Sequence, residues 1–365
     1  MKNEVALLLS LILLTGTTLL GGVPKDPVKT RNPLEEAQQI LETYVKENNV
    51  TGLSAAIAVQ NEVLWTGGFG YANLQHMVPA GSHTLYRIAS ISKPITAVLA
   101  MQLVEAGKLD LDKPIRFYIP LLHGPIGTIT SRQLLCHTSG IRHYRGDEFL
   151  SDIRHQSVLT PLSVFADDTL LFAPGERFSY TTFGYTLLSA VMEAAAGRSF
   201  LEKLNQNLVQ PLGLSTLRPE ESEQIIPNLA SFYLRRRDGI INAPFVDNSN
   251  KWAGGGLIST AGDLVKFAMH LMQGDLIKQA TLAKMFTLQH NNAGDTLEFS
   301  LGWRVDIDEE SGVREIWHTG GAMGGGGVLY FFPDQGIIFA SLANTNRVTH
   351  LQLARRIARL FLQTP

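Results

Sequence analysis

The spacing of apolar residues changes from a helical to a strand period near the start of the chain. A helix is predicted over residues 33–47, where one face carries Leu34, Ala37, Ile40, Leu41 and Tyr44. The next two apolar runs, 53–59 and 63–68, are short and β-rich, and Gln60-Asn61-Glu62 separates them. Two such runs joined by a short polar turn are typical of a β-hairpin.

The same pattern returns in reverse order at the other end. Apolar runs at 328–332 and 337–342 surround Pro333-Asp334-Gln335-Gly336, a sequence that favours a turn. A last amphipathic helix is expected after them, with apolar positions at Leu351, Leu353, Ile357, Leu360 and Phe361.

The middle of the chain has mostly helical patterns joined by polar or Pro/Gly-rich loops. They cover residues 94–107, 131–137, 183–196, 200–210 and 261–273. Strands at both ends with helices between them predict an α/β (α+β) fold, with an antiparallel sheet built from both termini and flanked by helices. We expect one domain over residues 33–365, with a mainly helical subdomain inserted at roughly 94–250.

The first 22 residues carry a different signal. Lys2 precedes an apolar run from Val5 to Leu14, and Gly21-Gly22 and Pro24 follow. A short positive start followed by such a run indicates a secretory signal, and the run falls short of the ~20 residues that a spanning helix needs. Residues 1–22 are therefore expected to be a signal peptide or an N-terminal anchor attached to a membrane, and the protein to be exported, periplasmic or secreted.

Composition and charge exclude several classes of function and of binding site. The 365 residues carry a formal net charge of −2 and no long basic run, which gives nucleic-acid binding no electrostatic support. The single cysteine, Cys136, excludes an intrachain disulfide; a buried thiol is the favoured interpretation, and a Cys136/His137 nucleophile is the alternative. No metal-ligand spacing is present, and the glycines at 320–327 lack the P-loop pattern, so no metal or cofactor is expected.

The strongest chemical signal is Ser90-Ile91-Ser92-Lys93, the single S-x-x-K of the chain. Pro94 fits only the first turn of a helix, and an amphipathic stretch continues to Gly107. Ser90 should therefore lie at a helix N-terminus, with Lys93 one turn later on the same face. A serine becomes a nucleophile when a neighbouring base removes its proton, and a lysine can do this when burial keeps it neutral.

Two further segments strengthen this hypothesis against that of an ordinary surface Ser and Lys. Tyr180 follows a turn and precedes a helical pattern, where its phenol could move protons near Ser90. His318-Thr319-Gly320-Gly321 lies at the end of a predicted strand, where glycines let substrate approach backbone N–H groups.

The order S-x-x-K, then Tyr180-x-Thr182, then His318-Thr319-Gly320 resembles the serine β-lactamase and penicillin-binding protein superfamily, in its class C branch. The stretches 139–144, 178–188 and 246–253 are similar to the mitochondrial serine β-lactamase-like members of that branch. The resemblance covers nearly all of residues 34–362. It implies the β-lactamase/transpeptidase-like fold and a serine hydrolase with a small-molecule or peptide substrate.

The resemblance also implies a role for each matching residue. Ser90 would form the acyl-enzyme, and Lys93 and Tyr180 would share the acid/base work. The backbone N–H groups of Ser90 and Gly321 would form the oxyanion hole. Thr182, His318, Thr319 and Gly320 would contact substrate.

Two residues depart from the β-lactamase pattern. Thr182 stands where these β-lactamases usually carry Asn, and His318 replaces their usual Lys. We therefore expect an ester, peptide or amide to be the better substrate, and the charge of His318 to change near neutral pH. A true class C-type β-lactamase, a penicillin-binding protein that does not hydrolyse its ligand, and a filament-forming protein remain the alternatives.

Overall fold

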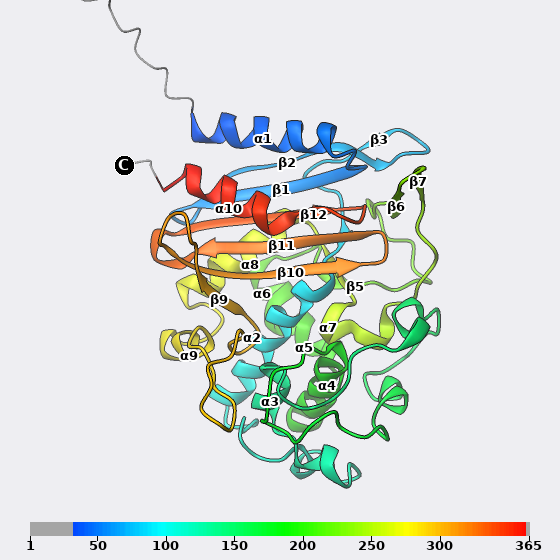
Figure 1. Cartoon of the computed structure of the whole chain (residues 1–365), viewed down its shortest axis with the longest axis vertical. Coiled ribbons are helices and arrows are strands. Elements are labelled where there is room, and N and C mark those ends of the chain that lie inside the picture. Colours follow the sequence, from blue (N-terminus) through cyan, green and yellow to red (C-terminus); the bar gives the residue numbers. More distant parts are fainter. Residues whose placement is uncertain (1–31, 363–365) are drawn as a thin grey trace, which may run out of the picture. The chain divides into compact units, whose positions relative to one another are not determined.

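The two ends of the chain meet in one antiparallel sheet (Figure 1). The structure is a computed structural model that describes residues 32–362, so the predicted signal or anchor segment lies outside the described residues. The sheet has seven strands in the order β3-β2-β1-β12-β11-β10-β9. They are β1 (Gly52–Val59), β2 (Glu62–Asn73), β3 (Val78–Pro79), β9 (Arg304–Ile307), β10 (Arg314–Ala322), β11 (Gly325–Phe332) and β12 (Ile337–Ala343).

The N-terminal and C-terminal hairpins are joined where β1 pairs with β12, from Leu53 opposite Ala343 to Val59 opposite Ile337. The turn between β1 and β2 places Gln60 and Asn61 at φ angles of 50° and 65°. Two consecutive residues with positive φ suit the right-handed twist of the flanking strands. Gly336, at φ 64°, ends the turn between β11 and β12. Both predicted hairpins are confirmed.

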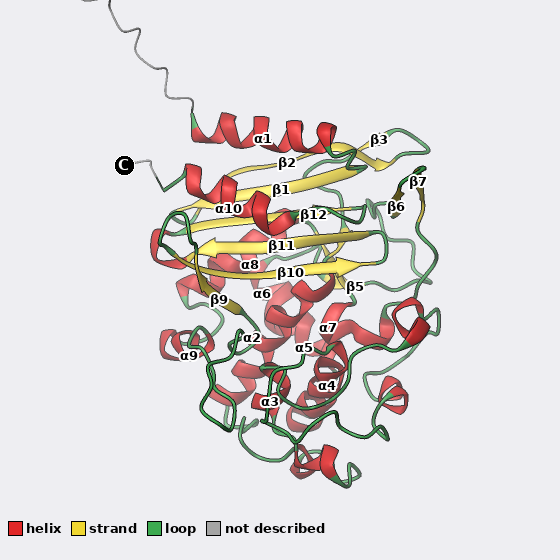
Figure 2. Ribbon diagram, in the orientation of Figure 1, coloured by secondary structure: helices red, strands yellow, loops and turns green. Residues whose placement is uncertain are grey.

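Helices cover both faces of the sheet (Figure 2). α1 (Pro33–Glu47) and α10 (His350–Leu360) contact each other on one face, where α1 packs on β2 and α10 on β11 and β12. The buried positions of α10 are Leu353, Ala354, Ile357 and Ala358, together with His350. On the other face, α8 (Ala261–Gln273) packs against β1 and β12. Because both faces are covered, β1 and β12 are almost entirely apolar.

The remaining elements form a mainly helical layer beneath α8 and the sheet. Its helices are α2 (Ser92–Glu105), α3 (Ser131–Leu135), α4 (Thr182–Ala196), α5 (Phe200–Leu204), α6 (Gln210–Leu212), α7 (Trp252–Gly255) and α9 (Gln279–Met285). Its short strands β4 (Tyr86–Arg87), β8 (Leu257–Ser259) and β5 (Arg218–Pro219) pair in that order, whereas β6 (Tyr233–Arg236) and β7 (Gly239–Asn242) form a hairpin beside the end of the large sheet (Figure 1). The predicted helix over 200–210 is interrupted by a π-helical turn at 205–209, directly before Pro211 in α6. The boundaries of the predicted inserted subdomain stay a prediction.

The helix that follows Ser90 differs from its sequence-based expectation. α2 is buried around most of its circumference, by α4 and α7 among others, rather than along one apolar face. Polar positions of this helix, including Ser92, Lys93 and Thr96, are as buried as its leucines. Every buried polar atom on this helix therefore needs a partner inside the protein. Within residues 32–362, no helix has both the length and the apolar character needed to cross a bilayer.

Candidate active site

Ser90 lies in a tight turn between β4 and α2. The 3-10 turn Ala89–Ile91 leads directly into α2, and Ala89 adopts a left-handed φ of 50°. Strand β10 packs against this turn at Gly320, where a Cβ atom would clash with the carbonyl oxygen of Ile88. Glycine at position 320 therefore lets the strand approach the backbone beside Ser90. Ser90 itself remains half-buried.

Lys93 contacts Ser90 from one turn into α2. Its Nζ lies 3.1 Å from Ser90 Oγ, 3.2 Å from Thr182 Oγ1 and 2.6 Å from the carbonyl oxygen of Gly254. The side chain is fully buried, and no carboxylate is among these partners. Burial, with a smaller contribution from the charge of Lys251, lowers the pKa of Lys93 well below the usual lysine value.

Tyr180 completes a group of three side chains. It precedes α4, whose N-cap Thr181 accepts a hydrogen bond from the amide of Gly184. The Tyr180 hydroxyl interacts with Ser90, and burial raises the pKa of Tyr180 to about 12. Its ring lies 4.2 Å from the His137 ring, and Lys93 Nζ lies 4.8 Å from the Tyr180 ring centre. The structure thus brings Ser90, Lys93 and Tyr180 together as predicted.

A cavity of about 60 Å³ opens beside Ser90. Its walls come from the loop before α4, from α7 and from β10, and consist of Ser90, His143, Tyr144, Phe149, Thr182, Asn248, Lys251, Gly254, Gly255, Gly321, Ala322 and Met323. Of the predicted substrate and oxyanion residues, Ser90, Thr182 and Gly321 line it, and a Cβ at Gly321 would meet only open space. Tyr180, His318, Thr319 and Gly320 lie outside this wall.

The surroundings of His318 contradict the expectation that its charge changes near neutral pH. Its side chain is only 3% exposed, and Nδ1 donates a hydrogen bond to the carbonyl oxygen of Thr319 at 2.6 Å. Burial, together with the charge of Lys93, lowers the pKa of His318 to about 3. The expected change of charge near neutral pH is therefore wrong, because the apolar surroundings disfavour the imidazolium.

The structure adds two residues that the sequence patterns did not indicate as part of the site. Lys251, within the stretch 246–253, is 5% exposed, and burial lowers its pKa to about 8. His143 accepts a hydrogen bond from the amide of Thr182 at 3.4 Å through Nδ1, and burial lowers its pKa to about 4. Both residues lie in stretches that carry the family resemblance, 139–144 and 246–253, but the resemblance gave neither a role, and the packing of distant segments places them at the site.

The alternative nucleophile, Cys136, lies at the end of α3. It is 1% exposed, and burial raises the pKa of its thiol to about 12, which opposes the reactive thiolate. Its neighbour His137 accepts a hydrogen bond from the amide of Thr181 at 3.2 Å and packs on Tyr180. His137 thus contacts the Ser90 group rather than serving the thiol.

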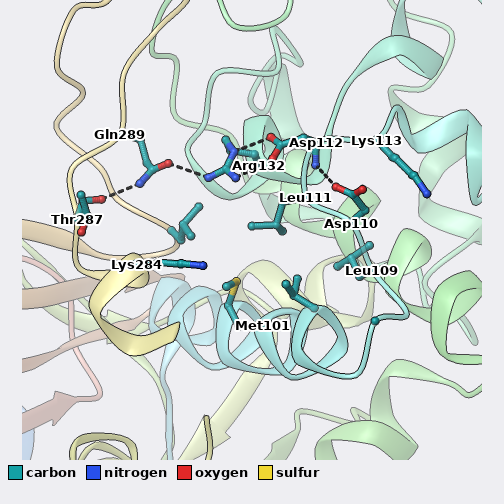
Figure 3. A pocket seen from close by; sticks show the side chains of 13 residues that line it. Met101, Leu109, Asp110, Leu111, Asp112, Lys113, Arg132, Lys284, Thr287 and Gln289 are labelled. Carbon is teal, nitrogen blue, oxygen red and sulfur yellow. Dashed lines mark hydrogen bonds and ion pairs between the residues drawn. The ribbon is translucent and has the colours of Figure 1, made fainter. Parts of the chain in front are cut away.

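A larger cavity of about 530 Å³ lies elsewhere, between α2, the loop 107–113 and α9 (Figure 3). The polar side chains of its wall are hydrogen-bonded to one another. Arg132 pairs with both carboxylate oxygens of Asp112 and donates to Gln289, which in turn donates to the carbonyl oxygen of Thr287. This cavity contains none of the predicted site residues.

Ser90 lies at the start of a buried helix, where it contacts a lysine one turn later and a tyrosine that precedes another helix. This arrangement is that of a β-lactamase-related serine hydrolase. The family model described as Beta-lactamase matches residues 37–362, and the chain belongs to this family. This result confirms the recognised superfamily and the predicted enzyme class.

Three similar proteins illustrate the range of the family. The human protein "Serine beta-lactamase-like protein LACTB, mitochondrial" is 29% identical over 90% of this chain and 79% of its own. The octameric penicillin-binding protein homologue from Pyrococcus abyssi has a TM-score of 0.79 at 26% identity, covering 90% of this chain and 77% of its own. A D-stereospecific amidohydrolase from Streptomyces has a TM-score of 0.75 at 26% identity, covering 91% and 99%. These structures confirm the predicted fold.

The buried state of His318 leads to a first prediction. The imidazole should stay neutral from pH 8 down to pH 5, with its proton on Nδ1, because Nδ1 donates to Thr319 and burial opposes protonation. Long-range ¹H–¹⁵N NMR spectra of the native protein, assigned with His318→Gln, would measure this. The same residue in urea serves as the reference and should titrate near ~6.5. Titration of native His318 between pH 6 and 7 would contradict the geometry.

Proposed function

We propose that the protein is a serine hydrolase that acts on esters, peptides or amides through an acyl-enzyme on Ser90. The observation that carries the proposal is the fully buried Lys93, whose Nζ lies 3.1 Å from Ser90 Oγ with a strongly lowered pKa. A neutral amine has two hydrogens and one lone pair. Thr182 and Gly254 accept the two hydrogens, which leaves the lone pair for the proton of Ser90.

The first chemical step follows from this arrangement. Ser90 Oγ attacks the carbonyl carbon of the substrate while its proton moves to Nζ of Lys93. The carbonyl oxygen becomes an oxyanion, and the N–H groups of Ser90 and Gly321 are proposed to stabilise it, since both residues line the same cavity. His318 and Thr319 are proposed to border the substrate from β10.

Tyr180 is proposed as the acid of the pair. Its pKa is raised and that of Lys93 is lowered, and such divergence is typical of an acid and a base that act together. The Tyr180 phenol would give its proton to the leaving group and recover from Lys93 the proton that Lys93 took from Ser90. Collapse of the intermediate forms the Ser90 ester and releases the leaving group. Water then attacks this ester by the reverse proton route and frees Ser90.

The substrate preference rests on Thr182 and His318. The Thr182 hydroxyl is already engaged with Lys93 at 3.2 Å, and it cannot offer the paired donor and acceptor of an amide side chain. His318 is neutral and cannot supply the fixed positive charge that a β-lactam carboxylate needs. The similar Streptomyces protein is named a D-stereospecific amidohydrolase, which supports an amide or peptide as one substrate class.

The cellular location and the assembly of the protein are matters of proposal, and the location is argued from the sequence. We keep export as the proposed destination because of Lys2 and the apolar run after it, although the human relative carries the word mitochondrial in its name. The Pyrococcus homologue is described as octameric.

Reaction with a fluorophosphonate tests the nucleophile. A biotinylated fluorophosphonate should add one equivalent of mass to the native protein, and peptide mapping should locate it on Ser90. Ser90→Ala should lose the label completely, whereas Cys136→Ser, a matched control for the thiol alternative, should keep it. Labelling of Ser90→Ala at the native rate would exclude Ser90 as the nucleophile.

A substrate comparison tests the choice between hydrolase and β-lactamase. We expect kcat/KM for a chromogenic cephalosporin to lie well below that for an activated ester or a short D-amino-acid amide, because Thr182 and His318 lack the β-lactam contacts. Intact-mass measurement would separate slow turnover from a stable acyl-enzyme. A cephalosporin hydrolysed faster than every ester and amide tested would make the protein a true β-lactamase.

A further inference from the structure

Lys251 is a buried cation in the wall of the active-site cavity. Its side chain is 5% exposed, and its Nζ is buried with no hydrogen-bond partner among the described residues. The stem passes along Gly255, where a Cβ atom would lie 3.9 Å from Lys251 Cδ and 3.8 Å from the carbonyl carbon of Ala89. Gly255 thus separates the Lys251 stem from the residue that precedes the nucleophile.

The nearby carboxylates are already occupied. Glu220 accepts hydrogen bonds from Arg87 and from the side-chain amide of Asn248. Asp247 accepts from Ser222 Oγ at 2.6 Å and from the Ser249 amide at 2.9 Å. Neither carboxylate is a hydrogen-bond partner of Lys251 Nζ among the described residues.

Aromatic rings make up the rest of its surroundings. Lys251 Nζ lies 5.4 Å from the ring centres of both Tyr144 and Phe149. Ring faces attract a cation but accept no conventional hydrogen bond. Although burial and the charge of Arg87 lower its pKa to about 8, the amine is still mainly protonated at pH 7. A buried ammonium without an acceptor is costly, and an anion entering the cavity would offset that cost.

The cavity contains no competing positive charge. Among its lining residues, the other titratable base is His143, whose pKa of about 4 leaves it neutral at pH 7. The cavity is small, about 60 Å³, and both Ser90 and Lys251 line it. A substrate whose carbonyl meets Ser90 can therefore present an anionic group to Lys251 from the same small molecule.

We propose that Lys251 is a specificity-determining residue that binds a carboxylate on the acyl half of the substrate. The preferred substrates would then be half-esters or half-amides of short dicarboxylic acids, such as glutaryl derivatives. The acyl half is assigned as part of the proposal, because Ser90, which would carry the acyl group, and Lys251 line the same cavity. The inference rests on the proposed function of Ser90.

A matched pair of esters tests the inference. Mono-4-nitrophenyl glutarate and 4-nitrophenyl valerate have the same chain length and leaving group, and they differ in a terminal carboxylate against a methyl group. The quantity to compare is kcat/KM for the glutarate ester divided by kcat/KM for the valerate ester. At pH 7 this ratio should be about 10- to 100-fold higher for the wild type than for Lys251→Met, because loss of a charge-assisted hydrogen bond typically has an effect of this size. Lys251→Arg should recover part of the ratio. Lys46→Met, on the exposed face of α1, is the control and should leave the ratio unchanged.

The kcat/KM ratio of the two esters distinguishes carboxylate binding by Lys251 from an electrostatic effect of Lys251 on Lys93. Since the charge of Lys251 lowers the pKa of Lys93, its removal should shift the pH profiles of both esters together, without changing their ratio. An unchanged ratio in Lys251→Met, with valerate still hydrolysed, would overturn the inference. If the wild type hydrolyses neither ester, the ester activity within the proposed function is wrong, and thermal unfolding with free glutarate decides the question of binding. Glutarate should raise the Tm of wild type more than that of Lys251→Met, and equal shifts would overturn the inference.

Discussion

The active site depends on a lysine amine held inside the protein without an opposite charge. Lys93 has no carboxylate partner, and its three contacts are neutral oxygen atoms on the 3-10 turn Ala89–Ile91, on α4 and on α7. An isolated ammonium would be strongly disfavoured there, so the neutral amine is the form that the fold stabilises. The chemistry proposed for Ser90 follows from this constraint, since only an unprotonated amine can take up the serine proton.

The surrounding elements are arranged to maintain that constraint. α2 is buried by α4 and α7, and these two helices also supply the two acceptors, Thr182 and Gly254. On the other side, β10 approaches the Ser90 turn closely because residue 320 has no side chain. The sheet built from both chain ends thus positions β10, while the helical layer positions Lys93 and Tyr180. Neither layer alone would assemble the site.

Much of this could be predicted from the sequence, and the limits have physical reasons. The helix over 33–47 and the turn at Gln60-Asn61 are local features, because periodicity and turn chemistry act over a few residues. The pairing of Ser90 with Lys93 is also local, since it needs only one helical turn. The neutral state of His318 and the burial of Lys251 are not local. Tyr144 and Phe149 cover Lys251 from a distant part of the chain, and a single lysine in a polar stretch usually indicates a solvated side chain.

The protonation state of Lys93 is the most direct test of this account. In protein labelled with ¹³C and ¹⁵N at lysine, the Lys93 side-chain signals, assigned by their loss in Lys93→Met, can be followed through a pH titration. We predict that Lys93 titrates far below the ~10.4 of a free lysine and is neutral where the enzyme is active. A Lys93 amine that stays protonated up to the ordinary lysine range would show that it acts only as a fixed charge, and would contradict its assignment as the base for Ser90.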